Sequence, residues 1–169
     1  MRTACFWCRI IASARTHADI PGILKSAVSG SGNLTIDETT HMCFACSPIN
    51  PIGLKLVFAD KGDTCVTRFV PGPQHQGWTG RVHGGIVTTL LDEAMAQFLY
   101  RRDETAVTAE LTVRFRIPAP VGSELLVEAR QTGARGRLLT LEAKACLKDG
   151  TVVAVAQGKF LRVPPDALG

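Results

Sequence analysis

The sequence predicts an α+β fold in which a curved antiparallel β-sheet wraps around one long central helix. One segment has helical periodicity, two segments before it and four after it alternate as strands do, and tight turns separate the later strands. The predicted order of elements is β-β-α-β-β-β-β. A sheet with one apolar face must cover that face, and a single long helix is the obvious cover.

The helix is predicted over His83–Arg101, where apolar residues recur at intervals of three and four positions. These apolar residues are Val87, Leu90, Leu91, Ala94, Met95 and Phe98. Two acids, Asp92 and Glu93, lie in the middle of the segment. The apolar series predicts that most of the helix belongs to the core.

Alternation with a period of two predicts the strands. Leu54–Phe58 and Val66–Val70 form the first hairpin around a turn at Lys61–Asp63. After the helix, the strands are Leu111–Ile117, Leu125–Arg130, Leu139–Leu147 and Val152–Val163. Within the last strand, Gly158 is expected to mark a β-bulge.

Composition indicates one globular domain without a membrane span. The chain has 169 residues, of which 46% are hydrophobic and 20% are charged. No apolar run approaches the roughly 18–20 residues that a membrane span requires. The formal net charge is +4, with Lys and Arg scattered rather than striped. This pattern is compatible with a small anionic ligand, and we expect neither nucleic-acid nor membrane binding.

Six cysteines without a convincing secretory signal favour a reducing compartment, and we expect a cytoplasmic location. The pairs Cys5/Cys8 and Cys43/Cys46 are each spaced as CxxC, so together they could supply four zinc ligands. Their separation is longer than in the usual zinc ribbons. We therefore expect reduced thiols and no metal.

Residues 1–41 lack sustained periodicity and are interpreted as an N-terminal extension. The domain is predicted over residues 42–165, followed by a tail at 166–169. Arg2, Arg9 and Arg15 precede the first acid, Asp19, and this bias resembles an organelle transit peptide. For this stretch we favour an extended or misassigned start of the sequence, or a disordered tail, over a transit peptide.

His83-Gly84-Gly85 opens the helix, where backbone N–H groups lack partners and the helix dipole is positive. Glycines let a ligand approach those N–H groups, which would polarise a carbonyl or stabilise an oxyanion. A tight turn into the helix is the structural alternative. Asp92 and Glu93 lie on opposite flanks of the apolar stripe, so helix geometry alone does not choose between these acids.

HGGIVTTLLDEAMA, which begins at His83, resembles the hot-dog-fold acyl-CoA thioesterases of the phenylacetic-acid-degradation type. Asp92 lies nine residues after His83, which matches the catalytic spacing of that family. Cys43–Phe58 resembles the segment that leads into the fold, and Leu111–Gly122 resembles the strand and turn after the helix. The resemblance covers about residues 42–165.

The resemblance implies a hot-dog fold paired into a homodimer or a dimer of dimers, with sites between subunits. It implies hydrolysis of an acyl-CoA thioester to a carboxylic acid and CoA, without a metal or redox cofactor. Gly85, with neighbouring Gly84, would polarise the thioester carbonyl through its N–H. Asp92 from the partner subunit's helix would attack the carbonyl or activate water. His83 would shape the turn or orient the substrate, and Gln76 would contact water or the carbonyl.

Further residues are candidates for substrate contacts. Thr88 lies one turn before Asp92 on the same helix face. The guanidinium group suits phosphate recognition, so four arginines are candidates for the phosphates of coenzyme A: Arg114, Arg116, Arg135 and Arg137. Trp78 and Phe98 are expected in the core.

Two departures from the family keep other functions open. Ala96 stands where some members carry Thr or Ser to hold water, and Gly77 stands where Asn or His is common. A non-catalytic module that binds acyl-CoA or an acyl carrier is therefore the alternative. A hydratase-type enzyme would require an Asp and His pair five residues apart, which the strand–helix loop lacks.

Overall fold

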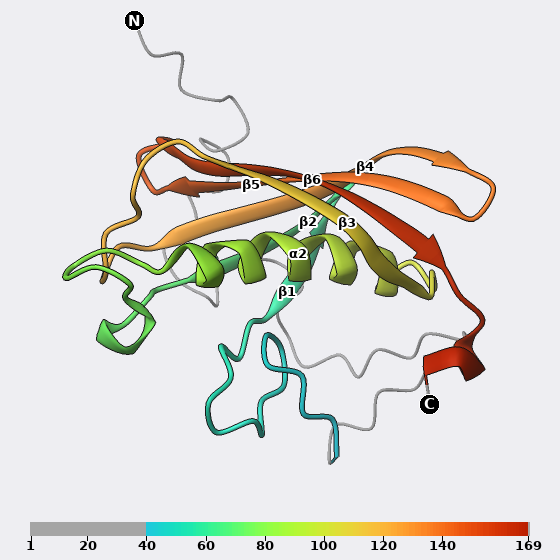
Figure 1. The fold of residues 1–169 in the computed structure, drawn as a ribbon, viewed down its shortest axis with the longest axis horizontal. Coiled ribbons are helices and arrows are strands. Elements are labelled where there is room, and N and C mark those ends of the chain that lie inside the picture. The colour runs from blue at the N-terminus through green and yellow to red at the C-terminus, as the bar shows by residue number, and fades with distance from the viewer. Residues whose placement is uncertain (1–39, 169) are drawn as a thin grey trace, which may run out of the picture.

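A single antiparallel sheet of six strands forms the fold in the computed structural model, which describes residues 40–168 (Figure 1). In chain order the strands are β1 (Phe58–Lys61), β2 (Thr64–Phe69), β3 (Ala106–Phe115), β4 (Leu125–Arg135), β5 (Leu138–Leu147) and β6 (Val152–Arg162). Their order in the sheet is β1-β2-β4-β5-β6-β3, so β1 and β3 form its edges. Two 3₁₀ turns, η2 (Pro73–His75) and η3 (Pro165–Leu168), complete the described elements. The predicted order β-β-α-β-β-β-β is confirmed.

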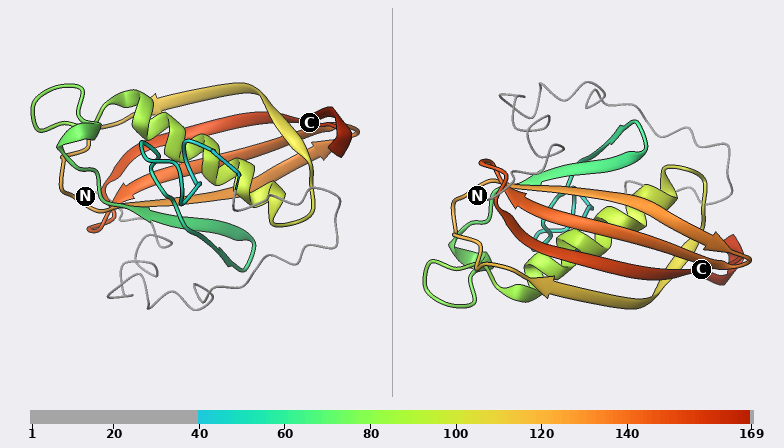
Figure 2. Two further views of the ribbon diagram at one scale, coloured as in Figure 1. Left: turned by 90° about the horizontal axis from the view of Figure 1, so that it is seen from below. Right: turned by 90° about the horizontal axis from the view of Figure 1, so that it is seen from above.

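The central helix, α2 (Gly84–Tyr100), lies along one face of the sheet, and the strands curve around it (Figure 2). All six apolar residues of the predicted stripe are buried, as is Leu99. They pack against alternate residues of β4 and β5, which face the helix as predicted. These facing residues are Leu125, Val127, Ala129, Leu139, Leu141, Ala143 and Ala145. Burial of this apolar surface is the main force that holds helix to sheet.

The first predicted strand is wrong over residues 54–57, because β1 begins only at Phe58. Leu54 and Leu56 are buried, as their alternation indicated. Their backbone N–H groups donate to the carbonyls of Phe44 (2.8 Å) and Ala45 (2.9 Å) instead of joining the sheet. Residues 54–57 therefore fasten the preceding loop to the core.

Gly158 does not form the predicted bulge, because it pairs regularly with Leu111 on one side and Leu141 on the other. A Cβ at this position would lie 2.7 Å from Cε2 of Phe160 and 3.1 Å from Sδ of Met95. Both neighbours are fully buried. The glycine is therefore needed for close packing of α2 on β6.

We expect Gly158→Ala to lower the free energy of unfolding by about 1–3 kcal/mol, because a buried ring and a buried thioether would have to move. Denaturant unfolding monitored by circular dichroism would measure the change. Gln157→Ala, at the exposed neighbouring position, is the matched control. Equal midpoints for the two variants would contradict this account of Gly158.

The predicted domain boundaries remain predictions. Most of the predicted extension, with Cys5 and Cys8, lies outside residues 40–168.

Candidate active site

The side chain of His83, the first residue of the His83-Gly84-Gly85 tripeptide, caps the start of α2. His83 is the N-cap residue, and its Nδ1 accepts the Gly85 N–H at 2.9 Å. The His83 carbonyl accepts the Ile86 N–H at 3.0 Å. The Gly84 N–H has no acceptor in the described part of the chain. The Gly85 N–H, which the resemblance assigned to the substrate, is therefore already bonded to the His83 ring. The Gly84 N–H is the one that is available to a ligand.

The loop before the helix fixes this start in place. The His83 N–H donates to the His75 carbonyl at 2.9 Å, and the Val82 N–H donates to the Ala119 carbonyl at 2.9 Å. Oε1 of Gln76 accepts the Gly80 N–H at 3.2 Å. The Gln76 amide oxygen thus closes the loop, and its predicted contact with water or a carbonyl stays a prediction.

Phe115, at the end of β3, lies against the helix start. A Cβ on Gly84 would be 3.4 Å from Cζ of this ring, and the ring is 53% exposed. The alternation of the sequence placed Phe115 with the apolar face of its strand. No pattern in the sequence indicated that it lies beside Gly84.

Asp92 is half-buried on α2 and faces β3. Its Oδ1 accepts a hydrogen bond of 3.0 Å from the Thr108 hydroxyl. Burial raises the pKa of the Asp92 carboxyl, the Thr108 hydrogen bond opposes that rise, and the charge of Glu93 adds to it. A half-buried carboxyl with a raised pKa is better suited to accept a proton near neutral pH than a solvated one. Thr108 was missed, since the predicted strand began at Leu111.

Glu93 faces a different part of the molecule. Its Oε1 accepts a hydrogen bond of 3.0 Å from Nε2 of Gln97, and its Oε2 lies 3.9 Å from Sγ of Cys43. Helix geometry did not choose between Asp92 and Glu93, but the different residues that surround them distinguish the two acids. Only Asp92 faces the strand that ends at the helix entrance.

The helix start and Asp92 are too far apart to act on one carbon atom within one chain. Gly84 and Asp92 are eight residues apart on a continuous helix. At 1.5 Å per residue, their backbones are about 12 Å apart along the axis. Thr88, between them, is half-buried on the helix.

The four candidate arginines divide between two ends of the sheet. Arg114 and Arg116 flank Phe115 and are exposed near the helix entrance. Arg135 and Arg137 lie at the β4–β5 hairpin, where β5 pairs with the end of β6 (Figure 1). Nε of Arg137 donates to the Arg162 carbonyl at 3.1 Å. The structure therefore does not bring all four to one site.

The two aromatic residues that were expected in the core, Phe98 and Trp78, differ in burial. Phe98 is in the core as predicted, but Trp78 is 84% exposed because it lies in the loop before α2.

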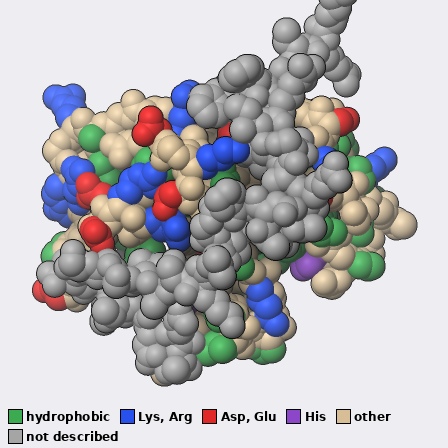
Figure 3. Space-filling model, turned by 180° about the vertical axis from the view of Figure 1, so that it is seen from behind, with side chains coloured by type: hydrophobic (Ala, Val, Ile, Leu, Met, Phe, Trp, Pro, Cys, Tyr) green, Lys and Arg blue, Asp and Glu red, His purple; other side chains and the backbone are tan. Residues whose placement is uncertain are grey.

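On the face seen from behind, Lys and Arg side chains are interspersed with acidic ones, as their scatter in the sequence predicted (Figure 3). Arg130 and Glu142, which pair between β4 and β5, form an ion pair. None of the helices within residues 40–168 has the length and apolarity to cross a membrane.

Comparison with known proteins adds independent findings. The family model described as "Thioesterase superfamily" matches residues 79–154, which include the helix and most of the sheet. Acyl-coenzyme A thioesterase THEM5 of Mus musculus is 30% identical over 106 residues, covering 62% of this chain and 42% of the relative. An uncharacterised mitochondrial protein of Candida albicans (strain WO-1) is 32% identical over 117 residues, covering 65% and 52%. The chain spans about half the length of these curated relatives.

Solved structures have the same arrangement of helix and sheet. A crystal structure of a thioesterase superfamily protein has a TM-score of 0.65 and 25% identity, covering 68% of this chain and 60% of that one. The Escherichia coli PaaI protein from the phenylacetic acid degradation operon has a TM-score of 0.61 and 21% identity, covering 64% and 84%. These likenesses confirm the predicted hot-dog fold.

The expected cytoplasmic location is wrong, because the Candida albicans relative is named as a mitochondrial protein. Free cysteines argued only for a reducing environment, and that property does not identify one compartment. Together, the family match and the solved structures show that this chain has the hot-dog fold and that its residues 79–154 are similar to the thioesterase superfamily.

Proposed function

We propose that this protein hydrolyses an acyl-CoA thioester to a carboxylic acid and CoA. The observation that carries the proposal is the environment of Asp92, a half-buried carboxyl with a raised pKa that a hydroxyl holds in one orientation. The available Gly84 N–H at the helix start supplies the second chemical group. The name of the mouse relative, an acyl-coenzyme A thioesterase, supports the same reaction.

In this mechanism the Gly84 N–H donates to the thioester carbonyl oxygen, with the dipole of α2 reinforcing the polarisation. Asp92 then takes a proton from water as the water oxygen bonds to the carbonyl carbon, or attacks that carbon itself. The carbon–sulfur bond breaks, and the CoA sulfur leaves with the electron pair and takes up a proton, which Asp92 supplies when water has attacked. When Asp92 itself has attacked, the acyl group stays on its carboxylate as an anhydride, and water then cleaves that anhydride to release the carboxylic acid. No cofactor takes part in the reaction, and CoA enters only as part of the substrate.

His83 has a positioning role in this scheme. Its Nδ1 accepts the Gly85 N–H, so a neutral ring carries its proton on Nε2. The ring thereby fixes the first turn and the direction of the Gly84 N–H. Arg114 and Arg116 lie near this entrance and are the proposed partners of the CoA phosphates.

The site is proposed to form between two copies of the chain. The distance of about 12 Å between Gly84 and Asp92 along one helix requires the acid to come from a second subunit. β3 is a ten-residue edge strand that, in the described part of the chain, pairs on one side only. An edge of that length is a surface on which another strand can pair. Light scattering of the purified protein would detect the dimer or a dimer of dimers.

A thiol-release assay against a panel of acyl-CoAs tests the activity. We expect catalytic release with at least one acyl group. If no acyl-CoA were hydrolysed but ligands still raised the thermal unfolding midpoint, the protein would be the alternative, a non-catalytic binding module.

Thr108→Val is expected to move the acid limb of the pH–rate profile to higher pH. The Thr108 hydroxyl stabilises the ionised form of Asp92, so its removal raises the pKa of that carboxyl further. A base acts when ionised, so half-maximal rate then requires a higher pH. Thr112→Val, which alters an exposed residue of the same strand, is the matched control. Identical profiles for both variants would contradict the assigned role of Thr108.

A further inference from the structure

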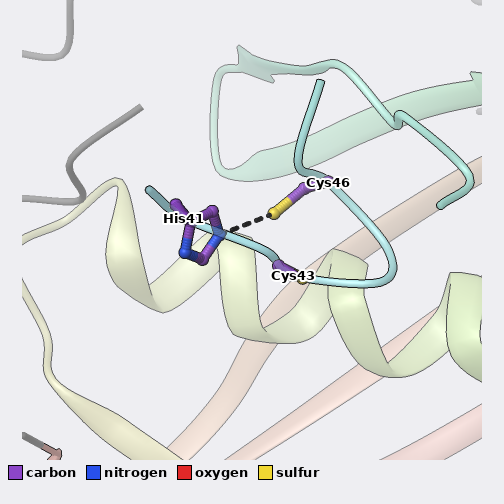
Figure 4. A group of neighbouring side chains, drawn as sticks. All are labelled: His41, Cys43 and Cys46. Carbon is purple, nitrogen blue, oxygen red and sulfur yellow. Dashed lines mark hydrogen bonds between the residues drawn. The ribbon is translucent and has the colours of Figure 1, made fainter. Parts of the chain in front are cut away.

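A cluster of potential metal ligands lies beside α2, away from the helix entrance (Figure 4). It consists of His41, Cys43 and Cys46, which are all half-buried. One ligand atom from each residue lies within 4.8 Å of the others. The segment that carries them runs across the middle of the helix, where Cys43 meets Glu93 (Figure 2).

The spacing of these atoms approaches that of a tetrahedral zinc site. Zn–S bonds of about 2.3 Å and Zn–N or Zn–O bonds of about 2.0–2.1 Å place neighbouring ligand atoms roughly 3.5–3.8 Å apart. Nε2 of His41 lies 3.7 Å from Sγ of Cys46. Sγ of Cys43 lies 3.9 Å from Oε2 of Glu93, whose carboxylate is outside the group of ligand atoms that all lie within 4.8 Å of one another, so this side chain would have to move toward the other ligands to complete a tetrahedron. A nitrogen, two sulfurs and a carboxylate oxygen are ligands that Zn²⁺ prefers.

Hydrogen bonds within the loop hold the ligands in position. The Ser47 hydroxyl donates to the His41 carbonyl at 2.6 Å, and the Ser47 N–H donates to the Cys43 carbonyl at 3.2 Å. Nδ2 of Asn50 donates to the Met42 carbonyl at 3.1 Å. The cluster therefore has a defined backbone, and metal binding requires little ordering of the loop.

Donors also surround the sulfur and carboxylate atoms. The Ala45 N–H donates to Sγ of Cys43 at 3.3 Å. Nε2 of Gln97 lies 3.6 Å from Sγ of Cys46 and donates to Oε1 of Glu93 at 3.0 Å. Such donors stabilise negative charge on metal ligands and fix their orientation. The three residues of the cluster thus have outer partners already present, and Glu93 is the nearby carboxylate that could supply the fourth ligand.

We propose that His41, Cys43, Cys46 and Glu93 bind one Zn²⁺ ion in a closed, structural site. Four protein ligands leave no open position, so the ion takes no part in hydrolysis. It fastens the loop to α2 at the residue next to Asp92. This site differs from the four-cysteine site considered from the sequence, because it uses one CxxC pair and does not require Cys5 or Cys8.

Metal analysis of the full-length chain, purified under reduction with added zinc, tests the proposal. We expect one equivalent of zinc in the wild type and in a Cys5→Ser/Cys8→Ser variant. Cys43→Ser and Cys46→Ser should lose the ion, and His41→Ala and Glu93→Gln should bind it more weakly. Gln97→Ala, which removes an outer partner, should weaken zinc affinity by about 10–100-fold. Cys146→Ser, a buried thiol outside the cluster, should retain zinc.

Cobalt substitution of the wild type keeps the proposal testable if a variant fails to fold. Tetrahedral Co²⁺ with two thiolates gives weaker sulfur-to-metal charge transfer than Co²⁺ with four. A wild-type protein that takes up no stoichiometric metal would overturn the proposal. So would zinc that is lost with Cys5→Ser/Cys8→Ser but retained in His41→Ala and Glu93→Gln. Neither readout depends on thioesterase activity, so this proposal and the proposed function can fail separately.

Discussion

Asp92→Asn is expected to lower kcat for acyl-CoA hydrolysis by about 10²–10⁴-fold. The amide has nearly the same shape as the carboxylate and can still accept a hydrogen bond from the Thr108 hydroxyl. It neither takes a proton from water nor attacks a carbonyl carbon. Thiol release under saturating acyl-CoA would measure the loss. Substrate affinity should change much less than kcat, because the acid acts on the reacting atoms.

The same substitution should leave the fold at least as stable at neutral pH. Burial raises the pKa of the Asp92 carboxyl, so the native state holds this proton more tightly than the unfolded chain. The resulting stabilisation is present below the ordinary carboxyl pKa and is lost as the pH rises through the raised value. Asparagine does not bear the cost of a half-buried charge. The thermal unfolding midpoint of the variant should therefore equal or exceed that of wild type near pH 7, with the difference shrinking in acid.

Glu93→Gln distinguishes the neighbouring acids. Glu93 contacts the loop that carries Cys43 and does not face β3, so its amide variant should keep a much higher kcat than Asp92→Asn. Rates that are normal in Asp92→Asn and low in Glu93→Gln would contradict the assignment of Asp92. Equal kcat in wild type and Asp92→Asn would contradict a chemical role for the acid.

The sequence predicted those parts of the fold that depend on local periodicity. The apolar stripe from Val87 to Phe98 identified the helix, because burial on one side imposes a repeat of three and four residues. Alternation in β4 and β5 identified residues that face the helix, such as Leu139 and Leu141. Residues 54–57 alternate for the same reason, but the N–H groups of Leu54 and Leu56 bond to a loop instead of a strand. Burial alone does not determine which partner a backbone takes.

The rest of the site depends on contacts between distant segments. Thr108 meets Asp92 because β3 returns beside α2, and no spacing in the sequence encodes that meeting. Arg135 and Arg116 are both arginines of strand ends, yet the topology places them at opposite ends of the sheet. The choice between Gly84 and Gly85 depends on the orientation of the His83 ring. His41 lay before the predicted domain start, so the ligand cluster was not apparent.

Gly84→Pro is expected to lower kcat by about 10²–10³-fold, which is the effect of removing one oxyanion donor. Proline lacks the N–H that is proposed to hold the thioester carbonyl. The fold should tolerate it, because Gly84 is the first residue of α2 and proline is favoured there. His83, which precedes it, is extended with φ −62° and ψ 135°, the conformation that a following proline requires. Circular dichroism should show an unchanged unfolding midpoint beside the loss of thiol release.

Gly84→Ala is the matched control, because it keeps the N–H and adds a Cβ 3.4 Å from the Phe115 ring, an acceptable contact. High activity in Gly84→Ala with low activity in Gly84→Pro assigns the loss to the N–H. Activity near that of wild type in both would exclude this donor. Because the site is proposed to join two subunits, mixing Gly84→Pro with Asp92→Asn subunits should restore roughly one quarter of wild-type activity. Half of the randomly formed dimers are then mixed, and each contains one site with both groups intact. Mixed dimers that remain inactive would mean that the N–H and the acid do not meet across the subunit boundary.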